Sequence, residues 1–282
     1  MSDAPKPAPL LKWVGGKTQL LGPLLNEFPG VFGKYYEPFI GGGAVFFNLD
    51  RPNSVISDVN ARLVNFYRQV AQVPDAVYEE VNKLREAFLQ TERPNEKTFY
   101  ELRGKLNSLT PDSPEAAAHF LVINKTAFNG MYRENKSGGF NVPFNKFRAL
   151  PAFLDLENLK LASTLLSQTE ILVSDYRVAT NSAVAGDLVY FDPPYVPLSI
   201  TSNFTGYSAG AFGEAQQLEL LQTAKELKSR GVFVVLSNSY TDWVTEHYAS
   251  AGFRVLSVDA RRNIAASPGS RASVREAIIV GF

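Results

Sequence analysis

The chain has 282 residues, enough for one large core or for a core domain with a smaller insert. Its 28 basic and 28 acidic side chains balance, so any surface that attracts a polyanion has to be local. The hydrophobic content of 45% and charged content of 20% are typical of a soluble globular protein, and no apolar run approaches the length of a membrane helix. We therefore expect a cytoplasmic protein with no membrane partner.

Metal and disulfide chemistry is not expected. The chain contains no cysteine, which excludes disulfides, thiolate metal ligands and a cysteine nucleophile. Its two histidines, His119 and His247, are far apart in sequence and do not form a zinc-binding pattern. Residues 1–7 carry no apolar signal core and are expected to be a short disordered lead-in.

The first informative segment, residues 11–17, is a glycine turn with Trp13 and Lys17 at its sides. Its spacing does not fit a Walker A phosphate loop. An indole packs well beside a nucleoside or a sulfonium, and a lysine neutralises a carboxylate. A sulfonium and a carboxylate are the charged groups of an amino-acid sulfonium such as S-adenosylmethionine. The alternative is that Trp13 is a core residue and Lys17 a surface residue.

A second glycine turn, residues 37–44, lies between an expected strand at 34–37 and a short helix at 44–49. Glycines allow a ligand to approach the backbone closely, and the amides of the following helix face it. The next expected strand, 54–57, ends at Asp58, whose carboxylate suits the two hydroxyls of a ribose. The pattern lacks the full glycine signature of a nicotinamide site, so NAD is not assigned.

The middle of the chain, residues 61–150, is expected to be a helical insert that interrupts an alternation of strands and helices. Amphipathic stretches lead into a loop rich in glycine and asparagine at 129–140. This loop mixes aromatic, amide and cationic side chains, which suits wedging into and reading a DNA duplex. A surface hairpin with its aromatic rings packed inward is the alternative. The expected helices are 63–70, 76–89, 98–109 and 115–124.

The C-terminal part returns to the alternating pattern, which predicts an α/β sheet covered by helices. A helix at 214–230 ends at Gly231 and leads into the next strand. The last strand is expected to pair antiparallel with its predecessor, because a loop with residues 267–270 joins them. The expected strands here are 171–174, 188–191, 232–237, 254–258 and 276–282.

The most telling stretch is Asp192-Pro193-Pro194-Tyr195, directly after the apolar strand 188–191. A carboxylate and a proline carbonyl can accept both hydrogens of a planar exocyclic amine while the tyrosine ring stacks on the base. The nitrogen lone pair then points at an electrophile. The alternative is an ordinary strand-to-loop turn. The tetrapeptide predicts an amine-alkylating active site with Asp192, Pro193 and Tyr195 as its catalytic residues.

In this order, the motifs resemble the Dam-type DNA adenine-N6 methyltransferases, the class alpha group with a DPPY motif. The resemblance covers nearly the whole chain and includes residues 12–17, 37–43, 129–133, 139–144, 192–195, 203–205 and the arginine pair at 261–262. It implies a Rossmann-like methyltransferase sheet, with 1–60 and 151–282 as the catalytic and cofactor-binding domain and 61–150 as a helical target-recognition insert.

The resemblance also implies S-adenosylmethionine as cofactor, S-adenosylhomocysteine as product and no metal. The target would be an adenine flipped out of double-stranded DNA, probed at its amine by Asp192 and Pro193 and stacked on Tyr195. The implied cofactor-binding residues are Trp13, Lys17, Phe39, Gly41, Gly43, Asp58, Asp175 and Asp192.

For DNA reading, the resemblance points to the sequence GATC, with Arg133 bidentate to a guanine edge. Phe128 stands where relatives often carry tyrosine, so an inserted ring without a hydroxyl is expected. Phosphate contacts are expected from Arg261, Arg262, Arg271, Lys136 and Lys146. The protein is expected to act as a monomer. The implied DNA-binding residues are Lys12, Phe128, Asn129, Met131, Arg133, Pro143, Arg261 and Arg262.

Two alternatives remain at this point. A cytosine-N4 or RNA-base methyltransferase would use the same amine geometry, although the former usually carries serine in place of Asp192. A protein that binds DNA and cofactor without catalysis is the other alternative, and it would not need the complete tetrapeptide.

Overall fold

The computed structural model describes residues 5–90, 96–147, 149–197, 212–261 and 273–282. These form two compact units. The first unit comprises Met1–Gly16, Ile40–Asn53 and Ser57–Ser174, and the second comprises Lys17–Phe39, Ser54–Ile56 and Asp175–Phe282. The division into 1–60 with 151–282 and an insert at 61–150 stays a prediction, because a division by compactness does not identify an insert.

A seven-stranded sheet has the order β3-β2-β1-β4-β5-β7-β6. Its neighbours β1, β4 and β5 run parallel, whereas β7 is antiparallel to both β5 and β6. The expected α/β class, a Rossmann-like methyltransferase sheet, is confirmed, and so is the antiparallel last strand. The strands are β1 (Tyr35–Pro38), β2 (Val55–Asp58), β3 (Glu170–Val173), β4 (Leu188–Phe191), β5 (Phe233–Ser239), β6 (Arg254–Arg261) and β7 (Ser273–Val280).

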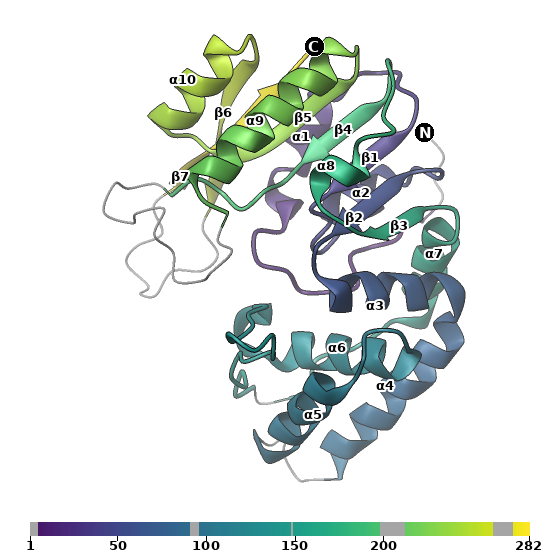
Figure 1. Cartoon of the computed structure of the whole chain (residues 1–282). Helices are drawn as coiled ribbons and strands as arrows, with labels where there is room; N and C mark the ends of the chain where they lie inside the picture. The colour runs from purple at the N-terminus through teal and green to yellow at the C-terminus, as the bar shows by residue number, and fades with distance from the viewer. Residues whose placement is uncertain (1–4, 91–95, 148, 198–211, 262–272) are drawn as a thin grey trace. The chain divides into compact units, whose positions relative to one another are not determined.

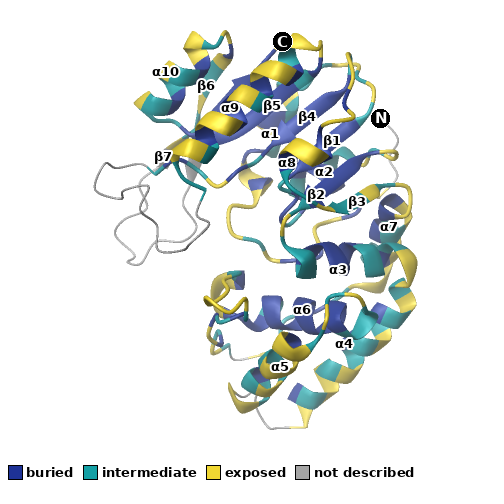
Figure 2. Ribbon diagram, viewed as in Figure 1, coloured by how far each residue is buried: buried dark blue, intermediate teal, exposed yellow. Residues whose placement is uncertain are grey.

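The central strands of the second unit are buried on both faces, which explains their nearly continuous apolar sequence. Figure 2 shows β1, β4 and β5 in the colour of buried residues. Helix α9 (Glu214–Ser229) lies along β4 and β5 in Figure 1 and buries Leu220, Ala224 and Leu227 at helical spacing. The remaining helices of this unit are η1 (Lys17–Gln19), α1 (Leu21–Asn26), α8 (Tyr176–Ala179) and α10 (Asp242–Ser250).

The first unit is built around α6 (Pro114–Thr126), which is buried on nearly every side. Helices α3, α4 and α5 all pack against it. Ser113 caps α6 by accepting a hydrogen bond from the amide of Ala116, and Pro114 fits the first turn because that position needs no amide donor. The other helices of this unit are α2 (Ala44–Leu49), α3 (Ala61–Gln72), α4 (Pro74–Leu89), α5 (Glu96–Ser108), η2 (Phe128–Gly130) and α7 (Leu156–Leu166).

Each strand and helix expected from the sequence is present, with ends shifted by up to three residues where they differ. Helices α1, α7, α8 and α10 were not predicted. The expected loop at 267–270 lies outside the described residues. In the described part of the chain, no helix combines the length and apolar character needed to cross a bilayer.

Helix α7 offers a matched test of core packing. Leu159 is fully buried, whereas Leu156 on the same helix is 37% exposed. We expect Leu159→Ala to lower the free energy of unfolding by about 2–5 kcal/mol, since it leaves a cavity. Leu156→Ala should cost less than about 1 kcal/mol. Urea denaturation followed by circular dichroism measures both values, and equal losses would contradict the packing described for α7.

Candidate active site

Asp192, the first residue after β4, forms an ion pair with Lys17. The Nζ atom of Lys17 lies 2.8 Å from Oδ1 of Asp192. Only 6% of the Lys17 side chain is exposed, compared with 21% for Asp192. The pair therefore keeps a buried cation neutralised while part of the carboxylate remains open to a ligand.

Burial raises the pKa of the Asp192 carboxyl above its ordinary value. The charge of Lys17 and its hydrogen bond oppose this rise, and the nearby carboxylate of Glu276 adds to it. A carboxylate with a raised pKa holds a proton better than an ordinary aspartate does. Asp192 is therefore suited both to accept hydrogen bonds and to take up a proton released beside it.

Tyr195 is fixed at both its hydroxyl and its ring. Its hydroxyl donates a hydrogen bond of 2.8 Å to Oε2 of Glu276 on β7. The ammonium of Lys17 lies 4.8 Å from the ring centroid, as a cation–π contact. Burial and the charge of Asp192 raise the pKa of Tyr195 well above its usual value, so the phenol stays neutral. Glu276 was not predicted as a site residue, although it stands in an apolar strand sequence where a carboxylate is unusual.

Buried amides fasten the turn that carries Asp192 and Tyr195. The side chain of Gln217 on α9 donates a hydrogen bond of 2.7 Å to the carbonyl of Pro194. Asn238 on β5 accepts one of 2.9 Å from the amide of Val196, and its own amide group donates to Gln217 at 3.2 Å. Both side chains are fully buried. Because each polar group has a partner, the turn is held without added charge.

Pro193 is buried within this turn, whereas Pro194 is exposed. The expected role of the Pro193 carbonyl as an acceptor stays a prediction. Gln217 and Asn238 were missed by the sequence reasoning. The available signal was a run of polar residues, Ser237 to Ser239, at the end of an otherwise apolar strand.

Phe39 lies in an aromatic cluster of the second unit. Its φ of 91° is in a region that bulky side chains rarely adopt, so the surrounding packing has to hold it there. Its ring stacks on Tyr176 at 5.3 Å and meets Phe191 and Phe212 edge-on. Tyr176, which was not predicted as a site residue, is buried and supports the ring of Phe39.

Asp175, expected near the adenine of the cofactor, caps α8. It accepts hydrogen bonds from the backbone amide of Arg177 at 2.9 Å and from its Nε at 2.8 Å. Partial burial acts to raise the pKa of Asp175, but the bonds and charge of Arg177 outweigh it and the pKa is lowered. Its visible role is therefore structural, and a cofactor contact stays a prediction.

Asp58, in the first unit, ends β2 and collects backbone amides. Its Oδ1 accepts from the amide of Asn60 at 2.9 Å and its Oδ2 accepts from the amide of Gly41 at 3.4 Å. Burial raises the pKa of Asp58, while these amides lower it in part. The long bond to Gly41 leaves acceptor capacity on the carboxylate for hydroxyl groups of a ligand.

The glycine turn lies against Trp13. Gly41 has a φ of 47°, and a Cβ there would lie 2.8 Å from Cδ1 of Trp13, so only glycine fits. Gly43 precedes α2, and its amide donates to the carbonyl of Ile40 at 2.8 Å. The carbonyl of Gly41 accepts a hydrogen bond of 2.8 Å from the hydroxyl of Tyr67, which was not predicted as a site residue.

The residues expected to read DNA lie in the first unit, and most of them are exposed. Phe128 keeps 47% of its surface exposed, and its amide donates to the carbonyl of Pro143 at 2.9 Å. Asn129 is held at a φ of 53°, and Met131 is half-buried. Arg133 is exposed and donates from Nε to the side chain of Asn141 at 2.7 Å.

Lys12 is exposed too, and its backbone is clamped by buried Asn124 on α6. Asn124 accepts from the amide of Lys12 at 2.9 Å and donates to its carbonyl at 2.7 Å. The same amide group lies 3.4 Å from the carbonyl of Gly130. Asn124, which the sequence reasoning missed, thus ties the expected cofactor segment to the expected recognition loop.

The expected phosphate contacts near the end of β6 are not described. Arg261 is the last residue of β6, and its side chain is not among those described. Arg262 and the motif at 203–205 lie outside the described residues. Within the described part of the chain, histidine, aspartate and glutamate form no cluster of three that could hold a metal ion.

Comparison with known proteins identifies the family. Residues 13–264 match the model of the D12 class N6 adenine-specific DNA methyltransferases. The chain is 39% identical to the type II methyltransferase M.MjaIII of Methanocaldococcus jannaschii, covering 91% of this chain and 92% of that protein. It is 36% identical to the type II methyltransferase M1.LlaDCHI of Lactococcus lactis subsp. cremoris, covering 97% and 95%. It is 31% identical to the DNA adenine methylase of Haemophilus influenzae, covering 98% and 94%.

The chain belongs to the D12 class N6 adenine-specific DNA methyltransferase family. The expected Dam-type resemblance and the expected adenine-specific DNA methyltransferase activity are confirmed. DNA is therefore its substrate, and membership supports S-adenosylmethionine as methyl donor. Among solved structures, a precorrin-6y C5,15-methyltransferase from Geobacter metallireducens is similar over 45% of this chain and 63% of that one, with a TM-score of 0.25 and 10% identity.

The ion pair makes a pH-dependent prediction. Because the cation of Lys17 lowers the pKa of Asp192, Lys17→Met should raise that pKa further. As the pH falls, the Asp192 carboxylate of the variant is then protonated at a higher pH than in the wild type, and activity is lost with the ionised form. We expect the acid limb of the log kcat profile, measured at saturating cofactor, to move upward by about one pH unit. Lys17→Arg keeps the charge and should leave the limb in place; a limb unmoved in Lys17→Met would contradict the assignment.

Proposed function

We propose that the chain transfers a methyl group from S-adenosylmethionine to N6 of an adenine flipped out of double-stranded DNA, within GATC. The observation that carries the proposal is the turn after β4, where a partly open carboxylate and a fixed, neutral tyrosine ring lie beside a buried lysine. Asp192 provides acceptor oxygens for an amine, and Tyr195 provides the face on which a base stacks.

Residues of both units have side chains or backbone whose chemistry suits this cofactor. Asp58 has acceptor capacity for two ribose hydroxyls, and Gly41 permits close approach to the backbone. Phe39 offers an aromatic ring supported by Tyr176, and Lys17 offers a cation for a carboxylate. When bound, the cofactor supplies an electrophilic methyl group on a sulfonium. Trp13, Gly43 and Asp175 are proposed as further contacts.

Asp192 acts as an orienting acceptor in this proposal. The N6 lone pair of adenine is delocalised into the ring, so the amine is a poor nucleophile. Acceptance of its hydrogens by Asp192 and by the Pro193 carbonyl localises that pair. A neutral aromatic amine is too weak an acid to be deprotonated first. The proton therefore leaves with or after methyl transfer, and the raised pKa of Asp192 favours it as the acceptor.

GATC is proposed from the residues that match the recognition positions of the family. Asn129, Arg133 and Pro143 are retained in this sequence. All three are exposed, as residues that enter a groove have to be. Arg133 would donate two hydrogen bonds to a guanine edge, after exchanging its contact with Asn141 for the base. Lys12, Phe128 and Met131 are proposed as neighbouring contacts, and Arg261 and Arg262 as phosphate contacts.

The reaction is tested by transfer of labelled methyl groups to duplexes that contain GATC or a variant with one base changed. We expect label on adenine N6 of GATC only. Asp192→Ala should lower kcat by about 100-fold or more, because it removes the acceptor. Thermal unfolding of the variant monitors its fold. Label on cytosine, or unchanged turnover by Asp192→Ala with an intact fold, would overturn the proposed chemistry.

Base reading is tested separately. Arg133→Ala should lower the preference for GATC over a duplex changed at the guanine by about 10- to 100-fold, which corresponds to about 1–3 kcal/mol. Exposed Lys136 in the same loop is the matched control. Lys136→Ala should weaken binding to all duplexes equally and reduce its salt dependence. Equal losses on both duplexes for Arg133→Ala would remove Arg133 from base reading.

A further inference from the structure

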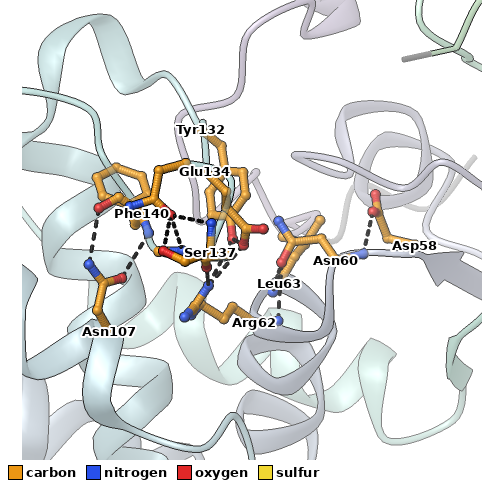
Figure 3. A network of polar contacts seen from close by, with 12 residues as sticks. Asp58, Asn60, Arg62, Leu63, Asn107, Tyr132, Glu134, Ser137 and Phe140 are labelled. Atoms are coloured by element: carbon orange, nitrogen blue, oxygen red, sulfur yellow. Dashed lines mark hydrogen bonds and ion pairs between the residues drawn. The ribbon is translucent and has the colours of Figure 1, made fainter. Parts of the chain in front are cut away.

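Arg62, the second residue of α3, is bound to the loop that carries Arg133. Its NH1 atom donates to Oε1 of Glu134 at 2.8 Å and to the carbonyl of Gly138 at 3.0 Å, and it lies 3.4 Å from the hydroxyl of Tyr132 (Figure 3). The Arg62 side chain is only 16% exposed. Three acceptors from one loop thus converge on one nitrogen of a mostly buried side chain.

The loop is a hairpin, closed by a bridge between Glu134 and Phe140. Residues 133–138 are exposed, so burial does not fix their conformation. The side chain of Asn135 holds the tip by accepting from the amides of Ser137 and Gly139, at 3.0 and 2.9 Å. Anchors outside the hairpin therefore decide where the backbone of Arg133 lies.

Two anchors of this kind are present, on different helices. Asn107 on α5 binds the backbone of Phe140 at both polar groups, with distances of 2.8 and 3.1 Å. Arg62 on α3 binds the opposite strand and the tip, at Glu134 and Gly138. Figure 3 shows these contacts on either side of the hairpin. Loss of one anchor leaves the other, so each can be removed without releasing the hairpin.

The Arg62 anchor is continuous with the end of β2. Asn60 caps α3 by accepting from the amides of Arg62 and Leu63, at 3.1 and 3.2 Å. The amide of Asn60 in turn donates to Oδ1 of Asp58 at 2.9 Å. Asp58 therefore holds the residue that starts the helix from which Arg62 reaches the hairpin.

A second connection runs through aromatic rings. The hydroxyl of Tyr132 donates to the same Glu134 oxygen that Arg62 binds. Its ring stacks on Trp13, with centroids 5.7 Å apart and an interplanar angle of 20°. Trp13 lies directly against Gly41, whose amide faces Asp58. The contacts therefore form a closed ring from Asp58 through Arg62 and Tyr132 back to Asp58.

We propose that Arg62 is a positioning residue that couples occupancy of the cofactor cluster, Trp13, Gly41 and Asp58, to the conformation of the hairpin that carries Arg133. The inference rests on the proposed function, in which that cluster binds S-adenosylmethionine and Arg133 reads a base. Two connections start from the cluster: Asp58 leads to Arg62, and Gly41 leads through Trp13 to Tyr132. A ligand bound to Asp58 and Gly41 stabilises both connections, and these hold the hairpin in its reading conformation. By thermodynamic reciprocity, cognate DNA then tightens binding of the cofactor.

The burial of Arg62 supports this role. Its Nε atom is buried and has no hydrogen-bond partner in the described part of the chain. The hydrogen bonds described for its side chain all go to the hairpin, so the charge is compensated only while the hairpin is in place. Displacement of the hairpin is therefore opposed from the α3 side, whereas neutral Asn107 exerts no comparable electrostatic hold.

The test measures a coupling factor, defined as the ratio of the Kd of S-adenosylhomocysteine without and with cognate duplex, by isothermal titration calorimetry. Wild-type protein should give a factor of about 5 or more. Arg62→Met should bring it close to one and should also lower the preference for the cognate duplex in binding. Asn107→Ala is the matched control: it should lower the preference but keep the wild-type coupling factor.

Tyr132→Phe carries the test if Arg62→Met does not fold. It removes the hydroxyl and keeps the ring on Trp13, so an intermediate coupling factor is expected. A wild-type factor of one, an Arg62→Met factor equal to wild type, or an equal loss in Asn107→Ala would overturn the inference. In each of these three cases the wild-type chain can still methylate adenine, so the proposed function stands. If the wild-type chain does not methylate adenine, the proposed function itself is wrong.

Discussion

The ion pair between a buried lysine and a partly buried carboxylate determines the electrostatics of the turn after β4. Lys17 compensates the charge of Asp192 at 2.8 Å, and the same ammonium lies over the ring of Tyr195. Without the cation, burial would favour the protonated acid, which accepts hydrogen bonds poorly. Lys17 thus opposes the effect of burial on Asp192 and favours the ionised form, which accepts hydrogen bonds.

The backbone of the turn around this pair is fixed by neutral groups. Gln217 and Asn238 hold the Pro194 carbonyl and the Val196 amide, and they satisfy each other. A charged anchor in the same place would shift the pKa of Asp192 as well as hold the backbone. Amides supply geometry alone. Lys17 and Glu276 therefore set the charge balance at Asp192, and the two amides set the direction of the backbone.

The sequence predicted the parts of this protein that local pattern determines. Apolar runs ending in a carboxylate gave β2 with Asp58 and β4 with Asp192, because a strand and the residue after it are neighbours in the chain. Helix α7 was missed, although Asp155 caps it and apolar residues recur at helical spacing. Arg62 and Asn238 could not be identified in the same way. Their partners lie 72 and 42 residues away, so nothing local distinguishes them from ordinary polar residues.

Side chains that read DNA have to be exposed, so packing in a core cannot hold their conformation. In the first unit the side chains that we propose read DNA are exposed, and the backbone beneath them is bound: Asn124 clamps Lys12, and Asn107 and Arg62 hold the hairpin of Arg133. Such anchoring lowers the conformational entropy that a reading loop loses when it binds. Asn124, Asn107 and Arg62 fix the backbone from which these exposed side chains extend, and so set the direction of each residue proposed to read DNA.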